Sequence, residues 1–366
     1  MSPRVPLDAW QVGPWNRWAY VHVDEVVPTA ALARGGGPAA PLPAADAGLE
    51  DLAADLLESG WVDGLAVLHR GSLVVERYGG EAGPASLHLS QSVGKSVLGL
   101  LVGVLAGQGR LDPDASVTEH VPEVRGSGYD GARVTHLLDM TAAVDFTEDY
   151  AVDFWRYDVA CAWCPPREGA PARSVLEFLP GIGPAGRPHG ERMHYATPTT
   201  DLLGLVAERA GGAPLAELLS RELWAPLGAE HDALVTVDLE GTATIGGGFC
   251  ATLRDYARLG ALVLDGGRGI VPEGWVARLG AGDPEAYARC TVPERTAGAE
   301  GYALQWWRRD GRPTARGIHG QLIAVDHAAQ AVVAILSSWP EATDAALEAA
   351  HRGLVDRVCR RLREQD

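Results

Sequence analysis

The chain has 366 residues, 46% of them hydrophobic, and a formal net charge of −17. This length predicts about two domains whose core needs neither disulfides nor a metal, and the negative charge disfavours nucleic acid and anionic membranes as partners. The N-terminus lacks an apolar leader, and the longest apolar run, residues 97–107, is too short to span a bilayer. Because the five cysteines are also widely spaced, unlike a secreted disulfide framework, we expect a cytoplasmic protein.

The first hundred residues contain an arm, two strands and a buried helix. Residues 1–45 are rich in Pro, Ala and Trp, which predicts an extended arm, and leucines at helical spacing predict a helix over 47–60. Residues 63–78 have the pattern of two strands joined by a turn at Arg70-Gly71. The segment 92–106 is apolar on almost every side, which predicts a buried helix.

The rest of the chain is first helical and then rich in strands. We expect helices at 199–210, 214–224, 252–264 and 341–363, and strands at 302–308, 314–318, 322–326 and 331–338. Between them, the long aromatic loop 145–188 has the character of a functional loop. The order predicts an α/β protein, with a sheet domain from 1–90 and 240–366, including the arm, and a mainly helical domain from 91–239.

Ser92 and Lys95 form an S-x-x-K motif at the start of the predicted buried helix. Residues three apart on a helix share one face. A serine hydroxyl becomes a nucleophile when a neighbouring base takes its proton, and burial lowers the pKa of a lysine enough for this role. Lys95 is the only lysine among the 31 lysine and arginine residues. An arginine at this position could not accept a proton. The position of Ser92 at the helix start also places its N–H as an oxyanion donor.

Six stretches of the sequence resemble the class C β-lactamase-like serine hydrolases. They are SVGKS (92–96), GRLDPDASV (109–117), VTHLLDMTAAVDF (134–146), HYATPTTDLLG (194–204), GGGFCATLRDYARLG (246–260) and GIHGQ (317–321). The segments WNRWAYVHVDEVVPTA and FTEDYAVDFWRYD resemble in particular the 6-aminohexanoate-oligomer hydrolases. The resemblance implies a β-lactamase/penicillin-binding-protein-like α/β sandwich with an antiparallel sheet and an inserted helical domain, with Ser92 between the two.

The resemblance also implies roles for residues outside the S-x-x-K motif. Tyr195 occupies the position of the second proton carrier, and Thr197 stands where many relatives have asparagine. The third motif falls on His319-Gly320-Gln321, where Gly320 allows close approach to substrate and the Gln321 N–H is the second oxyanion donor. His319 lacks a lysine's charge, so we expect it either to bind a substrate carboxylate only weakly or to be a structural histidine of the strand, satisfied by its neighbours.

Aromatic and acidic residues are candidates for the wall of the pocket. Trp155, Tyr157, Trp306 and Trp307 are expected either to line it or to pack in the core. The loop also carries Asp145, Glu148, Asp149, Asp153 and Asp158, which form a solvated acidic loop unless one of them holds a substrate ammonium.

The sequence therefore predicts a hydrolase that cleaves an amide or ester of a small molecule through an acyl-enzyme on Ser92. One alternative is transfer of the same acyl group to an amine acceptor, and another is a binding protein of the same fold without turnover. Cys161 and Cys164 form a C-x-x-C without a second ligand pair nearby, so no metal is expected there, and no cofactor is required.

Overall fold

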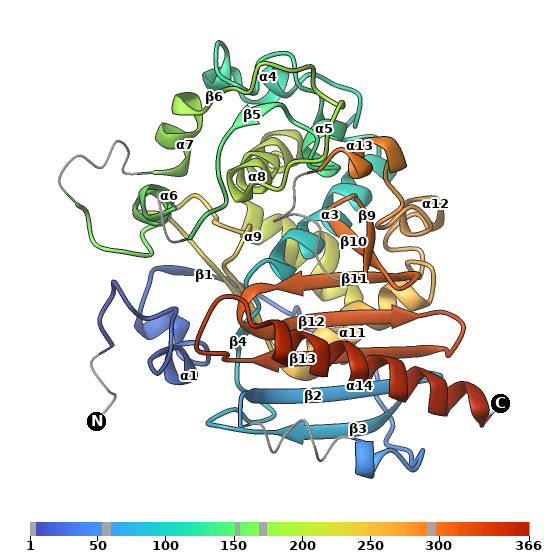
Figure 1. Cartoon of the computed structure of the whole chain (residues 1–366). Coiled ribbons are helices and arrows are strands. Elements are labelled where there is room, and N and C mark those ends of the chain that lie inside the picture. Colours follow the sequence, from blue (N-terminus) through green and yellow to red (C-terminus); the bar gives the residue numbers. More distant parts are fainter. Residues whose placement is uncertain (1–4, 53–59, 151–153, 168–173, 291–297, 366) are drawn as a thin grey trace.

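The computed structural model describes residues 5–52, 60–150, 154–167, 174–290 and 298–365. Its main element is a seven-stranded sheet in the order β3-β2-β13-β12-β11-β10-β9, in which every neighbouring pair is antiparallel. The strands are β2 (Val62–His69), β3 (Ser72–Tyr78), β9 (Ala299–Ala303), β10 (Trp306–Arg309), β11 (Arg312–Gly317), β12 (Gln321–Asp326) and β13 (Ala331–Ser337). Segments from both ends of the chain thus form one sheet, as the sequence predicts (Figure 1).

Helices cover both faces of this sheet. Val333 and Ile335 of β13 pack in one cluster with α14 (Ala345–Glu364), whereas Val332 and Ala334 pack in another with α11 (Leu253–Leu264). Successive side chains of a strand point to opposite faces, so a fully apolar strand requires cover on both sides. This arrangement confirms the predicted α/β sandwich.

The helix α3 (Val93–Gly107) runs through the interior between the sheet and the helical part of the chain (Figure 1). Thirteen of its residues, from Val93 to Leu105, are buried, as its apolar sequence predicts. Glycine permits close packing here, because a Cβ at Gly94 would lie 2.3 Å from the carbonyl oxygen of Ile245. The nucleophile candidate at the start of α3 therefore stands on a rigid, buried element.

Along the chain, most of the helical part follows α3 and precedes β9, the first of the C-terminal strands of the large sheet. Its helices are α4 (Val117–His120), α5 (Val134–Leu138), α6 (Trp155–Ala160), α7 (Val175–Phe178), α8 (Thr197–Gly211), α9 (Leu215–Leu218), the π-helix η4 (Leu219–Trp224) and α10 (Ala225–Leu227). The short strands β5 (Val144–Asp145) and β6 (Gly183–Pro184) pair within it, and α12 (Glu273–Val276) and α13 (Pro284–Ala288) follow α11. No helix in the described part of the chain is long and apolar enough to cross a membrane.

The N-terminal segment is packed and partly helical, which corrects the prediction of an extended arm. It contains α1 (Asn16–Ala19), the 3-10 helix η1 (Val23–Glu25) and β1 (Thr29–Leu32). β1 pairs with β7 (Ala233–Thr236), and a four-stranded sheet continues through β8 (Phe249–Ala251) to β4 (His88–Leu89). Trp10 and Tyr20 are fully buried, because the apolar side chains of this segment complete the core around α3.

One further prediction of secondary structure is wrong, and another lies partly outside the described residues. The predicted strand 302–308 is two strands, β9 and β10, which are joined at Leu304 and Gln305 with φ values of +54° and +66°. Hydrogen bonds from the Gln305 backbone and side chain to Leu138 and Leu137 hold this turn, which lacks the glycine that usually marks one. Of the predicted helix 47–60, residues 53–59 lie outside the described residues.

Candidate active site

Ser92 and Lys95 meet at the first turn of α3. Ser92 is the N-cap residue, and Lys95 Nζ lies 2.9 Å from Ser92 Oγ. The lysine side chain is only 1% exposed, and burial lowers the pKa of Lys95 to about 8, against the opposing charges of Glu148 and Asp201. About a tenth of this amine is therefore neutral at pH 7, far more than for an ordinary lysine, and this neutral form is available as a base.

The residue before the nucleophile is held in an unusual conformation. Gln91 has a φ of +50°, a left-handed value that turns the chain from β4 into α3. Its side-chain nitrogen donates to the Tyr20 hydroxyl over 2.8 Å, and the Ser90 hydroxyl donates to the Phe249 carbonyl over 3.0 Å. The N-terminal segment thus supports the turn that presents Ser92.

Tyr195 lies on the other side of Lys95. Lys95 Nζ is 5.1 Å from the centre of the tyrosine ring, which stacks on Trp307 with centroids 5.5 Å apart. Burial and the charge of Glu148 raise the pKa of Tyr195, and a hydrogen bond with Ser92 opposes this shift. The free site therefore holds a protonated phenol in contact with the serine, which is the form that donates a proton.

Thr197 and Glu148 complete the surroundings of Lys95. Thr197 Oγ1 lies 2.9 Å from Lys95 Nζ and donates its own proton to Glu148, whose other oxygen accepts the Thr197 N–H over 2.9 Å. Glu148 therefore lies next to the candidate base, whereas the sequence favours a solvated acidic loop for it. No local pattern distinguishes it from the other acidic residues of the loop.

A second carboxylate lies beneath the lysine. Asp201 of α8 is buried, accepts the Gly246 N–H over 2.7 Å and accepts the hydroxyl proton of Tyr157. Burial raises the pKa of Asp201 to about 6. Because Lys95 Nζ also donates to the Gly246 carbonyl, Asp201 holds the loop that fixes the lysine.

Ser92 lines two adjoining cavities. The smaller one is bounded by Gln11, Tyr157, Trp163 and Asp158, among others, and burial together with Glu148 raises the pKa of Asp158 to about 7. The larger one has a volume of about 1340 Å³ and extends from Ser92 past Tyr195 to the ends of β10 and β11. The larger cavity therefore has room for an elongated small molecule beside Ser92, whereas the smaller one, with a volume of about 30 Å³, admits only a group about the size of a water molecule.

The predicted wall residues divide between the cavities and the core. Trp307, Gly320 and Gln321 line the large cavity, and Tyr157 and Thr197 line the small one. Trp306 is instead a core residue, 1% exposed, whose indole donates to the Ser96 carbonyl over 3.0 Å. Trp155 also lines neither cavity, and it stacks against Arg156 and Arg167.

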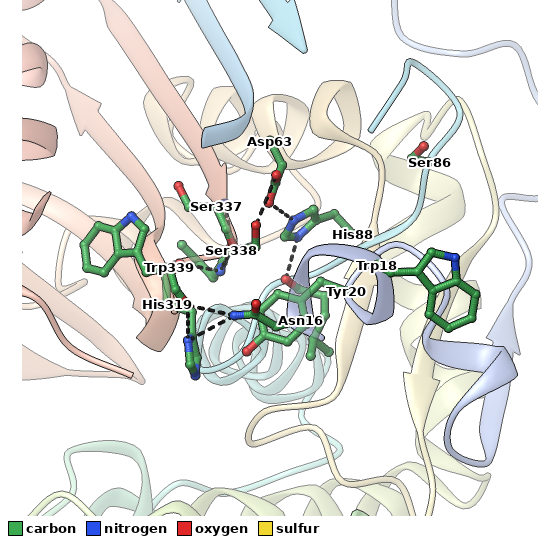
Figure 2. A network of polar contacts seen from close by, with 12 residues as sticks. Asn16, Trp18, Tyr20, Asp63, Ser86, His88, His319, Ser337, Ser338 and Trp339 are labelled. Carbon is green, nitrogen blue, oxygen red and sulfur yellow. Dashed lines mark hydrogen bonds and ion pairs between the residues drawn. The ribbon is translucent and has the colours of Figure 1, made fainter. Parts of the chain in front are cut away.

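His319 lies behind the site, which corrects its predicted contact with substrate. It lines neither cavity, and its Nδ1 is 2.7 Å from the Trp339 carbonyl and 3.4 Å from the Asn16 amide nitrogen (Figure 2). Its left-handed φ of +59° breaks the predicted strand 314–318 after Gly317, so the side chain turns toward the N-terminal segment. Burial lowers the pKa of His319 to about 4, which keeps it neutral.

A network of buried polar groups joins the N-terminal segment to the sheet (Figure 2). Asp63 of β2 contacts His88 Nε2 at 3.1 Å and accepts from the Ser338 hydroxyl at 3.2 Å. The Tyr20 ring lies edge-on to both His88 and His319, with centroids 5.8 Å and 5.6 Å apart. These contacts fix Tyr20, which in turn holds Gln91 beside the nucleophile.

The end of β11 lies directly against the nucleophile turn. A Cβ at Gly317 would lie 2.3 Å from the Ser90 carbonyl oxygen, so only glycine allows this approach. The next residue, Ile318, lines both cavities together with Ser92. Gln321 begins β12 opposite Gly317, and its amide side chain is bonded to Ser337.

Cys161 and Cys164 are both free and buried. Within the described ranges of the chain, no group of three or more His, Cys, Asp or Glu side chains is arranged to hold a metal ion.

Comparisons with known proteins agree with this geometry. The chain matches the beta-lactamase family over residues 49–357. A 6-aminohexanoate-dimer hydrolase from Paenarthrobacter ureafaciens is 39% identical over 352 residues, which cover 92% of this chain and 88% of that protein.

Solved structures share the fold. A Bacillus anthracis protein, provisionally assigned as a 6-aminohexanoate-dimer hydrolase, matches with a TM-score of 0.89 at 22% identity and covers 100% of this chain and 98% of that one. EstCE1, described as a hydrolase with promiscuous acyltransferase activity, matches with a TM-score of 0.66 at 16% identity and covers 84% of this chain and 97% of that one.

Proposed function

Because the chain belongs to the beta-lactamase family, we propose that it is a hydrolase that cleaves an amide or ester through an acyl-enzyme on Ser92. The observation that carries this proposal is the 2.9 Å contact between Lys95 Nζ and Ser92 Oγ in a buried site that lowers the pKa of the lysine. A neutral amine at this distance is positioned to accept the serine proton as the oxygen attacks a carbonyl.

Tyr195 supplies the proton that the leaving group needs. Its phenol is protonated in the free site and contacts Ser92. As the bond between the acyl carbon and the leaving nitrogen or oxygen breaks, Tyr195 donates to the departing atom, and Lys95 restores the phenol proton. The same groups then activate water, which attacks the acyl-enzyme and releases Ser92.

The oxyanion that forms during attack requires two N–H donors. We propose the Ser92 N–H as one donor, as the sequence predicts. For the second donor, we propose the Ile318 N–H in place of the predicted Gln321 N–H, because Ile318 borders both cavities at Ser92 whereas Gln321 borders only the larger one.

The small cavity, whose volume of about 30 Å³ admits only one small group such as an ammonium, suggests a substrate with a cationic end. Asp158 places a carboxyl group, with a pKa raised to about 7, among the aromatic rings beside Ser92. A substrate ammonium would stabilise the ionised carboxylate and stack against those rings. A linear amide of an amino carboxylic acid meets this requirement, which agrees with the relative named as a 6-aminohexanoate-dimer hydrolase.

Covalent labelling of Ser92 tests the mechanism. A fluorophosphonate or a p-nitrophenyl ester should add one acyl or phosphonyl group to Ser92, detected by intact-mass and peptide mass spectrometry, and Ser92→Ala should abolish it. Labelling at another residue, or none, would contradict the acyl-enzyme and would favour a binding protein without turnover.

Acyl transfer to an amine is the second candidate. The large cavity has room for an acceptor beside the acyl group, and EstCE1 shares the fold. Product analysis of an ester substrate with and without a primary alkylamine separates the two. A dominant amide product at millimolar amine indicates a transferase, and free acid indicates a hydrolase.

A further inference from the structure

Two arginines at the far wall of the large cavity share a single carboxylate. Arg309 of β10 and Arg316 of β11 both donate to Glu348 Oε1 of α14, over 2.8 Å and 2.5 Å. All three residues line the cavity. Two guanidinium charges against one carboxylate leave one positive charge uncompensated in this cluster.

The cluster is buried enough for that charge to matter. The Arg309 side chain is 8% exposed, and its Nε is buried without a hydrogen-bond partner among the described residues. Burial lowers the pKa of Arg316 to about 10, with Glu348 opposing and Arg309 adding to the shift, so Arg316 remains a cation at neutral pH. Glu341, an acidic lining residue shortly before α14, is exposed to solvent.

The cluster is joined directly to the candidate catalytic residues. Trp307 and Arg309, two residues apart on β10, share one face of the sheet with Arg316. The Arg316 guanidinium lies 6.0 Å from the Trp307 ring centre, and Trp307 stacks on Tyr195. Trp307 and Tyr195 therefore link Arg316 to Ser92, which Tyr195 contacts.

We propose that Arg309 and Arg316 form a carboxylate-binding subsite, which receives the anionic end of an extended substrate whose reactive carbonyl lies at Ser92. A guanidinium presents planar paired donors that match the two oxygens of a carboxylate, and a buried uncompensated cation favours an anionic ligand. This inference rests on the proposed function. The acyl-enzyme mechanism defines only the carbonyl that reacts with Ser92, and the inference adds a negative charge at the distant end of the same substrate.

The proposal is tested by binding rather than by turnover. In the full chain with Ser92→Ala, binding of hexanoate and of the uncharged hexanamide is measured by isothermal titration and by quenching of tryptophan fluorescence. We expect hexanoate to bind at least about 10-fold more tightly than hexanamide, and Arg316→Gln or Arg309→Gln to weaken hexanoate binding about 10- to 100-fold, as for a charge-assisted hydrogen bond.

Matched variants control for folding and for general charge. Arg308→Gln removes an arginine from the same strand, half-exposed and outside the cavity lining, and should leave hexanoate binding unchanged. Arg316→Lys keeps the charge but loses the planar fork, so its affinity should fall between those of the parent and Arg316→Gln, with thermal unfolding as the check on folding.

The two proposals fail in different ways. Equal affinity for hexanoate and hexanamide, or full hexanoate binding in both Arg309→Gln and Arg316→Gln, overturns the subsite even if Ser92 is acylated. Selective hexanoate binding without any labelling of Ser92 keeps the subsite and refutes the acyl-enzyme.

Discussion

Thr197 Oγ1 lies 2.9 Å from Lys95 Nζ while its own proton is donated to Glu148. The direction of these bonds is fixed, because a carboxylate accepts only and the threonine oxygen must then accept from the lysine. Glu148 thus fixes the orientation of the Thr197 hydroxyl that accepts from Lys95. Lys95 is oriented toward Ser92 by this pair.

Glu148→Gln should shift the pH dependence of acylation to lower pH. The Glu148 charge raises the pKa of Lys95, so its removal destabilises the lysine cation and lowers that pKa further below about 8. The rate of the p-nitrophenyl acetate burst against pH measures the shift. Asp145→Asn, an exposed change on the same loop, should leave the midpoint in place, and an unmoved midpoint in Glu148→Gln would show that Glu148 does not act on Lys95.

Acylation of the parent protein should accelerate as pH rises through about 8. The neutral amine of Lys95 is the base, and burial sets the pKa of Lys95 to about 8, so the active form is depleted below that value and dominant above it. Stopped-flow measurement of the burst between pH 6 and pH 10 checks the prediction. A rate independent of pH across this range would mean that another group takes the serine proton.

Lys95→Arg should slow acylation by about 10²–10⁴-fold, although the positive charge is kept. Arginine cannot be deprotonated in a protein, so the variant has a donor beside Ser92 and no base. Single-turnover kinetics with an activated ester measures the loss. The matched control is Arg110→Lys, which exchanges the same two residue types in the opposite direction. Arg110 forms a half-exposed ion pair with Glu222, so this variant should retain the parent rate.

Tyr20→Phe should lower the acylation rate about 2- to 10-fold with little change in KM. The variant removes the acceptor of the Gln91 side chain, which holds the left-handed residue before Ser92, and leaves the lining of the larger cavity in place. Tyr78→Phe, which removes a hydroxyl bonded to Glu76 on β3, is the control and should have the parent rate. A parallel rise in KM would point to a general loss of structure instead.

Gly94→Ala should destabilise the fold by about 1–3 kcal/mol. Its Cβ would lie 2.3 Å from the backbone oxygen of Ile245, so α3 or the loop that carries Gly246 must shift. Urea unfolding followed by circular dichroism measures the change. Gly36→Ala, where a Cβ meets nothing within 4 Å, should be close to neutral, and equal stability of the two variants would contradict the close packing described for α3.

Much of the fold was predictable because its signals are local. The turn at Arg70-Gly71, the apolar helix α3 and the apolar strand β13 follow from residue type and spacing. The division of 302–308 into β9 and β10 was not predictable, because Leu304 and Gln305 carry no turn signal. Tertiary hydrogen bonds from Gln305 to Leu137 and Leu138 impose the left-handed turn.

The sequence by itself determined the pairing of Ser92 with Lys95, because two residues that are three positions apart on a helix lie on the same face. Only the tertiary structure decided that Glu148, among the acidic residues of its loop, meets Lys95, and that His319 faces away from the large cavity. It also brought Arg309 and Arg316 to one carboxylate of a helix more than thirty residues later. The physical reason is that helical spacing is set by covalent geometry, whereas contacts between distant segments are set by how their buried surfaces pack.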